Sequence, residues 1–228
     1  METPRRSAAT TFRRRPDISP NLLHLVRGDT RADAFASLRT IVAEHCLRGS
    51  DSDIRDGYRC VSFTEAPVKQ LRDVYRWSTE RDLRFQAYGV LLGKDYLYSL
   101  GGRPVIYQSD VEYERLPESL RYRHMRYDPL ADPPVDFTWQ REWRLHADEL
   151  HLEPERCCIV VASEADRAVL LHEYEEHEEL RMEALVSADH ASLADQFAES
   201  FPWPVISLDV FRETPGARVA DPGLSRQG

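Results

Sequence analysis

One ten-residue stretch, FTWQREWRLH at residues 137–146, constrains the fold more than any other part of the chain. Apolar and polar side chains alternate along it, which is the pattern of a β-strand with two unlike faces. Trp139 and Trp143 lie on the apolar face, which suits a hydrophobic core. Gln140 and Glu142 lie on the polar face, roughly 6–7 Å apart at a rise of about 3.3 Å per residue. We expect a half-buried strand whose polar face meets solvent, and these two side chains should project from it side by side.

Other segments predict strands and helices in irregular order. Strands are expected over residues 21–27, 58–63, 85–92, 104–107, 157–162 and 204–210. Helices are expected over residues 31–46, 64–77, 94–100, 117–127, 163–183 and 191–201. The order lacks the regular alternation and the Gly-rich turn of a dinucleotide-binding sheet. The sequence therefore predicts an α+β fold with one core and no internal linker.

The two ends of the chain differ in composition from the rest. Residues 1–20 are polar, rich in arginine and bounded by Pro16 and Pro20, which is typical of a disordered basic arm. Its arginines suit phosphate contacts, and a solvated tail is the alternative. We expect one folded domain over residues 21–214 and a disordered tail over residues 215–228.

Charge and cysteine usage limit the class of function. The formal net charge of −9 gives no global footprint for nucleic acid, although a local basic groove remains open. No apolar run approaches about 18 residues, and the basic start lacks the apolar stretch of a secretory signal. The four cysteines form no CxxC motif, so neither a zinc knuckle nor a redox motif is expected. These features favour a reduced, cytoplasmic setting without a metal or membrane contact.

Polar side chains suited to chemistry fall on three separate predicted strands. His24 lies in the first strand, Ser62 and Thr64 lie where a middle strand meets a helix, and Gln140 and Glu142 lie on the late strand. Each has a structural alternative. A histidine in an apolar strand is often hydrogen-bonded within the core, and a serine or threonine at a helix start often caps the helix.

Glu142 also has a structural alternative, because Arg144 lies two residues further along the same predicted face. The two side chains can form a surface ion pair worth under about 1 kcal/mol. Trp139 and Trp143, on the opposite face, are expected to be core anchors.

The order His, Ser-x-Thr, Gln-x-Glu resembles that of the ADP-ribosyltransferase-like superfamily. The phrases VSFTEAP, GGRPVIY and WQREWRL also resemble abortive-infection (AbiGi-type) phage-resistance proteins. The resemblance spans residues 21–161 and implies a split, mixed or antiparallel sheet with flanking helices. It further implies NAD as a substrate and a toxin or phage-defence role. An antitoxin or trigger protein is an expected partner.

The resemblance also implies a role for each carboxylate and amide on the late strand. Departure of nicotinamide leaves positive, oxocarbenium-like charge on the ribose, and a carboxylate near the sugar stabilises that charge. Glu142 would be this carboxylate. Gln140 would orient the acceptor or the ribose.

The remaining site residues would bind NAD. His24 would bind a ribose hydroxyl, with Arg27 as the alternative candidate. Ser62 and Thr64 would lie beneath the nicotinamide, and Arg144 would bind either the pyrophosphate or Glu142. The middle motif departs from the family pattern, because it is Ser-Phe-Thr instead of Ser-Thr-Ser.

The tyrosine of the family's His-Tyr-Glu subgroup has two candidates here, Tyr88 and Tyr107. The expected reaction is transfer of ADP-ribose to a protein or nucleic-acid acceptor, with NAD hydrolysis as a variant. One alternative is a non-catalytic binding or sensor module of a defence system on the same fold. Another is a toxin that targets RNA or DNA through residues 121–127, from Arg121 to Tyr127, because basic residues interleaved with aromatics suit a nucleic-acid backbone and stacked bases.

Overall fold

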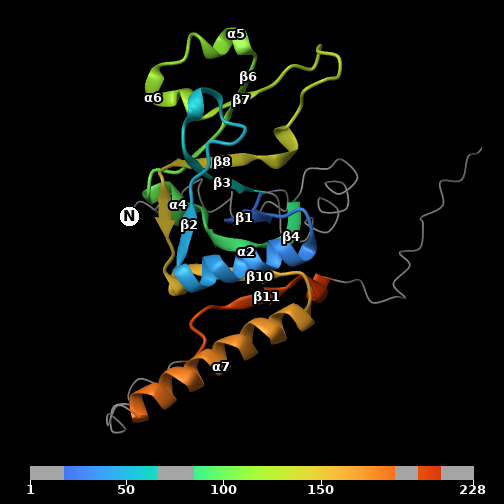
Figure 1. Cartoon of the computed structure of the whole chain (residues 1–228). Helices are drawn as coiled ribbons and strands as arrows, with labels where there is room; N and C mark the ends of the chain where they lie inside the picture. Colours follow the sequence, from blue (N-terminus) through green and yellow to red (C-terminus); the bar gives the residue numbers. More distant parts are fainter. Residues whose placement is uncertain (1–17, 66–84, 188–199, 212–228) are drawn as a thin grey trace, which may run out of the picture.

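The computed structural model of the chain describes residues 18–65, 85–187 and 200–211 (Figure 1). Within this part, the main sheet contains β1 (Asn21–Arg27), β3 (Cys60–Thr64), β4 (Phe85–Gly93), β5 (Arg103–Pro104), β8 (Glu142–His146), β10 (Cys157–Val161) and β11 (Val205–Ser207). Their order across the sheet is β11-β10-β4-β1-β3-β8-β5. Only the β10–β11 pair is parallel among these strands.

Two small sheets and several helices complete the described part. The small sheets pair β2 (Cys46–Arg48) with β9 (Glu149–His151), and β6 (Ile106–Gln108) with β7 (His124–Arg126). The α-helices are α2 (Arg31–Glu44), α4 (Lys94–Ser99), α5 (Asp110–Tyr113), α6 (Glu118–Arg121) and α7 (Glu164–Ser187). Short 3-10 turns are η1 (Arg55–Gly57), η3 (Thr138–Gln140), η4 (Pro154–Arg156) and η5 (Leu208–Phe211). The architecture is thus mixed α and β, with a mostly antiparallel sheet.

The main sheet is joined weakly at its centre. β1 runs beside β4 along its whole length, and β3 runs beside β8 along its whole length. Between β1 and β3, only Leu23 and Thr64 are in register. The two halves of the sheet therefore share a single registered backbone pair.

Hydrophobic side chains cover both faces of the half that contains β1 and β4. On one face, Leu22 and Val26 pack with Leu38 of α2, and all three are at most 4% exposed. On the other face, Leu23 packs in a smaller cluster with Leu91. Helix α2 begins as the sequence predicts, because Thr30 and its partner three residues later form a reciprocal capping box.

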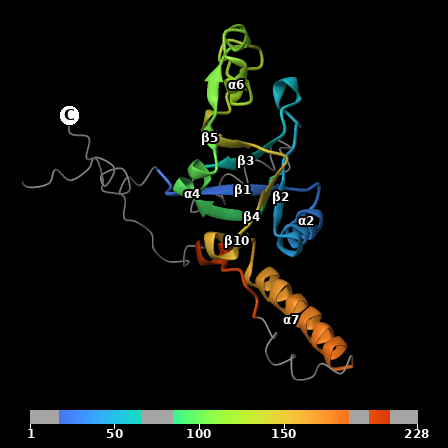
Figure 2. The same ribbon diagram turned by 90° about the vertical axis from the view of Figure 1, so that its left-hand side faces the viewer.

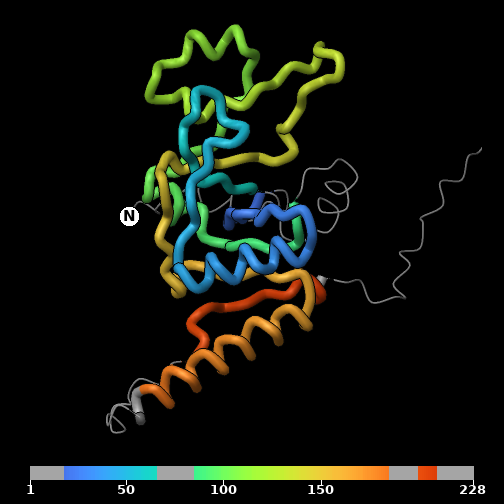
Figure 3. The backbone as a smooth tube through the Cα atoms, in the orientation of Figure 1, coloured from blue at the N-terminus to red at the C-terminus, as the bar shows by residue number. Residues whose placement is uncertain are grey.

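The polar upper lobe, residues 105–137, lies beyond the β5 edge of the sheet. Figures 1 and 2 both show α6 in this lobe at the top and α7 at the opposite end of the molecule. The backbone trace in Figure 3 shows that the loop containing η1 rises into the same region. Arg55 of this loop pairs with Asp110 of the lobe at 3.1 Å, so the two segments are in contact.

The expected ten-residue strand over residues 137–146 is wrong in its first half. Residues 138–140 form η3, and Arg141 has a left-handed φ of 44°. This conformation turns the chain, and β8 begins only at Glu142. Gln140 and Glu142 therefore do not project side by side from one strand. The polar face is also buried near its start, since Glu142 is 7% exposed and Arg144 is 2% exposed.

Two other expectations about local structure also need correction. The helix expected over residues 117–127 is only α6, and β7 follows it because residues 124–126 pair with β6. Tertiary pairing here overrides a weak helical preference. The last strand ends at Ser207 and continues as η5.

Several expectations fall on residues that the structure does not describe. The helices expected over residues 64–77 and 191–201 lie almost wholly outside the described residues. The same holds for most of the basic arm and for the tail at residues 215–228.

Candidate functional site

The carboxylate of Glu142 lies in a buried network at the start of β8. In the antiparallel pair of β3 and β8, Ser62 is opposite Arg144 and Thr64 is opposite Glu142. Side chains of opposed residues project to the same face of a sheet. As a result, the Ser62 hydroxyl donates to Oε1 of Glu142 at 3.0 Å, and Nε of Arg144 donates to the same oxygen at 2.7 Å.

The guanidinium of Arg144 also holds the upper lobe against the sheet. Its Nη1 donates to the backbone carbonyls of Tyr122 at 2.8 Å and His124 at 2.9 Å. The pair of Arg144 and Glu142 is therefore not a surface ion pair, because both side chains are nearly inaccessible. A buried charge of this kind persists only where an opposite charge and hydrogen bonds compensate it.

A tyrosine of the upper lobe completes this network. The backbone N–H of Glu142 donates to the hydroxyl oxygen of Tyr107 in β6, at 3.1 Å. Burial raises the pKa of the Tyr107 phenol above its usual value. The other candidate, Tyr88, is 1% exposed in the core, where its hydroxyl accepts from Arg31 at 2.9 Å. Of the two tyrosines, Tyr107 is the one in contact with Glu142.

His24 of β1 contacts Ser62 of β3, next to the single registered pair of these two strands. Its Nδ1 donates to the carbonyl oxygen of Ser62 at 2.9 Å, since a carbonyl can only accept. Burial lowers the pKa of the imidazole, which favours the neutral ring with Nε2 as an acceptor. The ring packs edge-on against Phe63, whose side chain lies on the opposite face of β3 from that of Ser62. His24 and Glu142 thus both bind Ser62, but from opposite sides of its strand.

The other predicted site residues are less closely associated with Glu142. Thr64 donates its hydroxyl to the backbone carbonyl of Gln140 at 2.5 Å, so the main chain of Gln140 is the part in contact. Arg27 is half exposed at the other end of β1 and pairs with Asp53 at 3.2 Å. The structure therefore brings Ser62 and Arg144 into contact with Glu142. His24 contacts the Ser62 carbonyl from the opposite side of β3, and Arg27 lies apart from both.

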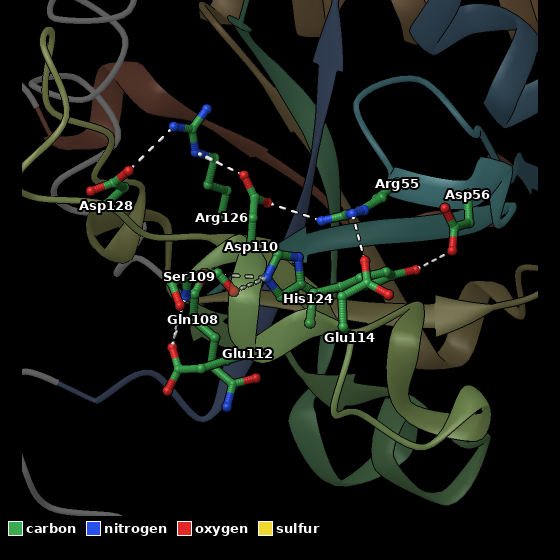
Figure 4. Close-up of polar contacts among 11 residues, drawn as sticks. Arg55, Asp56, Gln108, Ser109, Asp110, Glu112, Glu114, His124, Arg126 and Asp128 are labelled. Carbon is green, nitrogen blue, oxygen red and sulfur yellow. Dashed lines mark hydrogen bonds and ion pairs between the residues drawn. The ribbon is translucent and has the colours of Figure 1, made fainter.

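The arginines of residues 121–127 are bound within the upper lobe. Figure 4 shows Arg126 between Asp110 and Asp128. Its guanidinium pairs with the carboxylate of Asp110 at 3.4 Å and with that of Asp128 at 3.3 Å. Arg121 and Arg123 donate to backbone carbonyls of neighbouring segments. The two carboxylates offset the charge of Arg126, and the carbonyl contacts hold the side chains of Arg121 and Arg123 against the lobe, whereas nucleic-acid binding needs basic side chains that reach phosphates. The arrangement weakens the interpretation of this segment as a nucleic-acid site.

Sequence patterns did not reveal two features of the site. The carbonyls of Tyr122 and His124 carry no side-chain signal, and the burial of Arg144 depends on the position of the upper lobe. For the tyrosine of the site, the sequence offered two candidates, Tyr88 and Tyr107, without distinguishing them.

In the described ranges, no group of three or more His, Cys, Asp or Glu side chains is arranged to hold a metal ion. Of the helices described, none combines the length and apolar character needed to cross a bilayer. Comparison of the chain with family models, curated proteins and solved structures found no match.

Proposed function

We propose that this protein is an ADP-ribosyltransferase of the ADP-ribosyltransferase-like fold, which uses NAD as its substrate and a macromolecule as its acceptor. In this proposal it acts as a toxin or phage-defence effector. The observation that carries the proposal is the hydrogen bond of 3.0 Å between Ser62 and Glu142, with His24 bonded to the same serine. The resemblance requires the first, middle and late strands to meet, and β1, β3 and β8 are neighbours in the sheet.

The state of the Glu142 carboxylate supports this chemistry. Oε1 accepts from Ser62 and Arg144, whereas Oε2 has no hydrogen-bond partner among the residues described. A carboxylate fixed in this way can stabilise positive charge on a ribose without reorienting during the reaction. The bond between the anomeric carbon and nicotinamide breaks, and nicotinamide leaves with the bonding electrons. The acceptor then bonds to that carbon and releases a proton, and water as acceptor gives hydrolysis.

The neighbours of Glu142 act as positioning residues in this scheme. Arg144 orients the carboxylate and does not bind pyrophosphate, because its guanidinium is 2% exposed and bound to three oxygens. Ser62 holds the carboxylate from β3. His24 fixes the peptide of Ser62 from β1.

The test is incubation of the purified protein with labelled NAD and a cell lysate. Glu142→Gln should lower label transfer and nicotinamide release by about 100-fold or more, because it removes the charge that stabilises the transition state. Glu65→Gln is the matched control. Glu65 is a partly buried carboxylate that pairs with Lys94 at 2.5 Å and takes no part in the proposed chemistry. Circular dichroism should show that both variants are folded.

Two results would contradict the proposal. Retention of full activity in Glu142→Gln would exclude Glu142 as the catalytic carboxylate. Absence of both transfer and hydrolysis in the wild-type protein would exclude the enzyme and favour a binding module. The binding module has one observation in its favour, because the ion pair of Glu142 with Arg144 at 2.7 Å also serves as a structural link to the upper lobe.

A further inference from the structure

Helix α7 has an exposed acidic face that no described segment covers. Its packed side includes Leu170, which is 4% exposed in the core. The opposite side contains Val169 and Leu180, which are 44% and 65% exposed. These two residues are about three helical turns apart, so they lie on the same face of the helix. Exposed glutamates lie on and beside this face, namely Glu175, Glu176, Glu179 and Glu183.

The charge on this face is unfavourable for the helix itself. Glu175, Glu179 and Glu183 follow one another at a spacing of four residues, and like charges at this spacing repel. The C-terminal end of a helix carries partial negative charge, which basic side chains offset, but the last turn of α7 contains none. Within the part of the chain that the structure describes, neither Glu175 nor Glu179 forms an ion pair. A cationic partner would therefore stabilise this part of α7.

The first residues of the chain contain positive charge in an otherwise acidic protein, whose formal net charge is −9. Residues 1–17 lie outside the described residues, and their sequence includes Arg5, Arg6, Arg13, Arg14 and Arg15. Phe12 directly precedes the last three arginines, so the segment combines basic groups with an apolar side chain. The exposed face of α7 is complementary to it, with carboxylates beside the side chain of Leu180.

The chain enters β1 at the end of the sheet toward which α7 runs. β1 begins at Asn21 beside the end of β4, where β10 also begins. β10 and β11 are parallel, so the connection that contains α7 returns to the end of the sheet where both strands begin. Figures 1 and 2 both show the later turns of α7 extending beyond these strands.

The basic segment is long enough to reach this part of α7. Only β4 separates β1 from β10, so the starts of these two strands lie roughly 10 Å apart. Residues 5–18, fully extended, span up to about 45 Å, whereas the whole of α7 spans roughly 36 Å. The acidic face therefore lies within reach of the arginines of the same chain.

We propose that residues 5–15 bind the exposed face of α7 in the same molecule. The arginines pair with Glu175 and Glu179, and Phe12 packs against Leu180. Neither segment takes part in the chemistry proposed for Glu142, so the contact and the proposed function can fail separately. The alternatives are a solvated arm and a contact with α7 of another copy of the chain.

Hydrogen–deuterium exchange of α7 in the full chain tests this contact. Arg13→Glu/Arg14→Glu/Arg15→Glu should speed exchange in the later turns of α7 by about three- to tenfold, the effect of two or three surface ion pairs. Exchange in α2 should not change, which shows that the variant is folded. In about 1 M salt the difference should largely disappear, because the Debye length falls to about 3 Å.

Reversal of charge on the helix supplies the matched comparison. In a Glu175→Arg/Glu179→Arg background, the same arm variant should slow exchange of α7, because both partners then have exchanged sign. The sign of the arm effect does not depend on new contacts that these arginines form within the helix. Glu114→Arg/Glu118→Arg is the control background, since both glutamates are exposed in the upper lobe, at the other end of the molecule. There the arm variant should speed exchange of α7 as in the wild-type protein.

Three results would overturn the contact. Unchanged exchange of α7 in the arm variant would indicate a solvated arm. An equal acceleration in the Glu175→Arg/Glu179→Arg background would exclude these glutamates as the partner. Protection of α7 that rises with protein concentration would indicate binding to another copy. Inversion of the arm effect in that background alone, independent of concentration, supports the contact.

Discussion

Replacement of Arg144 by methionine tests the buried network that positions Glu142. Methionine retains much of the side-chain volume but removes the charge and the hydrogen bonds to Glu142, Tyr122 and His124. Removal of one partner of a buried ion pair costs about 3–5 kcal/mol, because the other charge is left uncompensated. We therefore expect Arg144→Met to lower the free energy of unfolding by about 3–5 kcal/mol, a large part of the roughly 5–15 kcal/mol typical of a folded protein.

The double variant Arg144→Met/Glu142→Gln identifies the source of this loss. It contains no uncompensated carboxylate, so its loss of unfolding free energy should be smaller than the sum of the two single losses by about 2 kcal/mol or more. The assay is urea unfolding at pH 7, followed by tryptophan fluorescence and circular dichroism.

A second cycle on an exposed ion pair serves as the control. Arg48 and Glu44 are 69% and 42% exposed and pair at 2.9 Å, so their coupling should be at most about 0.5 kcal/mol. The reasoning about Arg144 is refuted if Arg144→Met costs less than about 1 kcal/mol and its effect adds to that of Glu142→Gln.

Two further predictions follow from pKa values. Burial lowers the pKa of His24 below 6.5, so its contribution to stability is present above that pH and is lost as the pH falls through the lower folded value. The amide of the His24→Gln variant can still donate to Ser62. This variant should flatten the fall of unfolding free energy between pH 7 and pH 5 by up to about 1.4 kcal/mol per pH unit. The control His151→Gln, at an exposed histidine, should leave the slope unchanged, and equal slopes in the two variants would contradict the burial of His24. Burial raises the pKa of Cys60 and Cys157 to about 11, so both thiols should react slowly with a disulfide reagent at pH 8 in the native protein and rapidly in urea. Rapid native labelling of either cysteine, identified by mass spectrometry, would contradict this.

Local sequence patterns predicted those elements whose own side chains determine them. The apolar run of β10 and the stripe and capping box of α2 needed no knowledge of their neighbours. The strand prediction is wrong at Arg141. This residue has a left-handed backbone conformation that ends the strand, although the alternation of apolar and polar residues in the sequence continues through it. The helix prediction is wrong at β7, whose residues extend only because β6 lies beside them.

The sequence also predicted only part of the candidate site. Residue types and their order singled out Glu142, Ser62 and His24 on separate strands, because polar side chains in apolar runs are visible in the sequence. Their association depends on the sheet order, which joins strands far apart in the chain. Side-chain patterns do not specify which strands are neighbours.

The sequence alone therefore determined a mixed α and β chain and the polar residues on its strands. Only the tertiary structure decided that Arg144 is buried, that Tyr107 binds the backbone of Glu142, and that His24 approaches Ser62 from the other side of β3. The physical reason is that burial and hydrogen-bond partners come from segments distant in the chain. The upper lobe supplies the hydroxyl and the carbonyls that convert a polar strand face into an enclosed carboxylate.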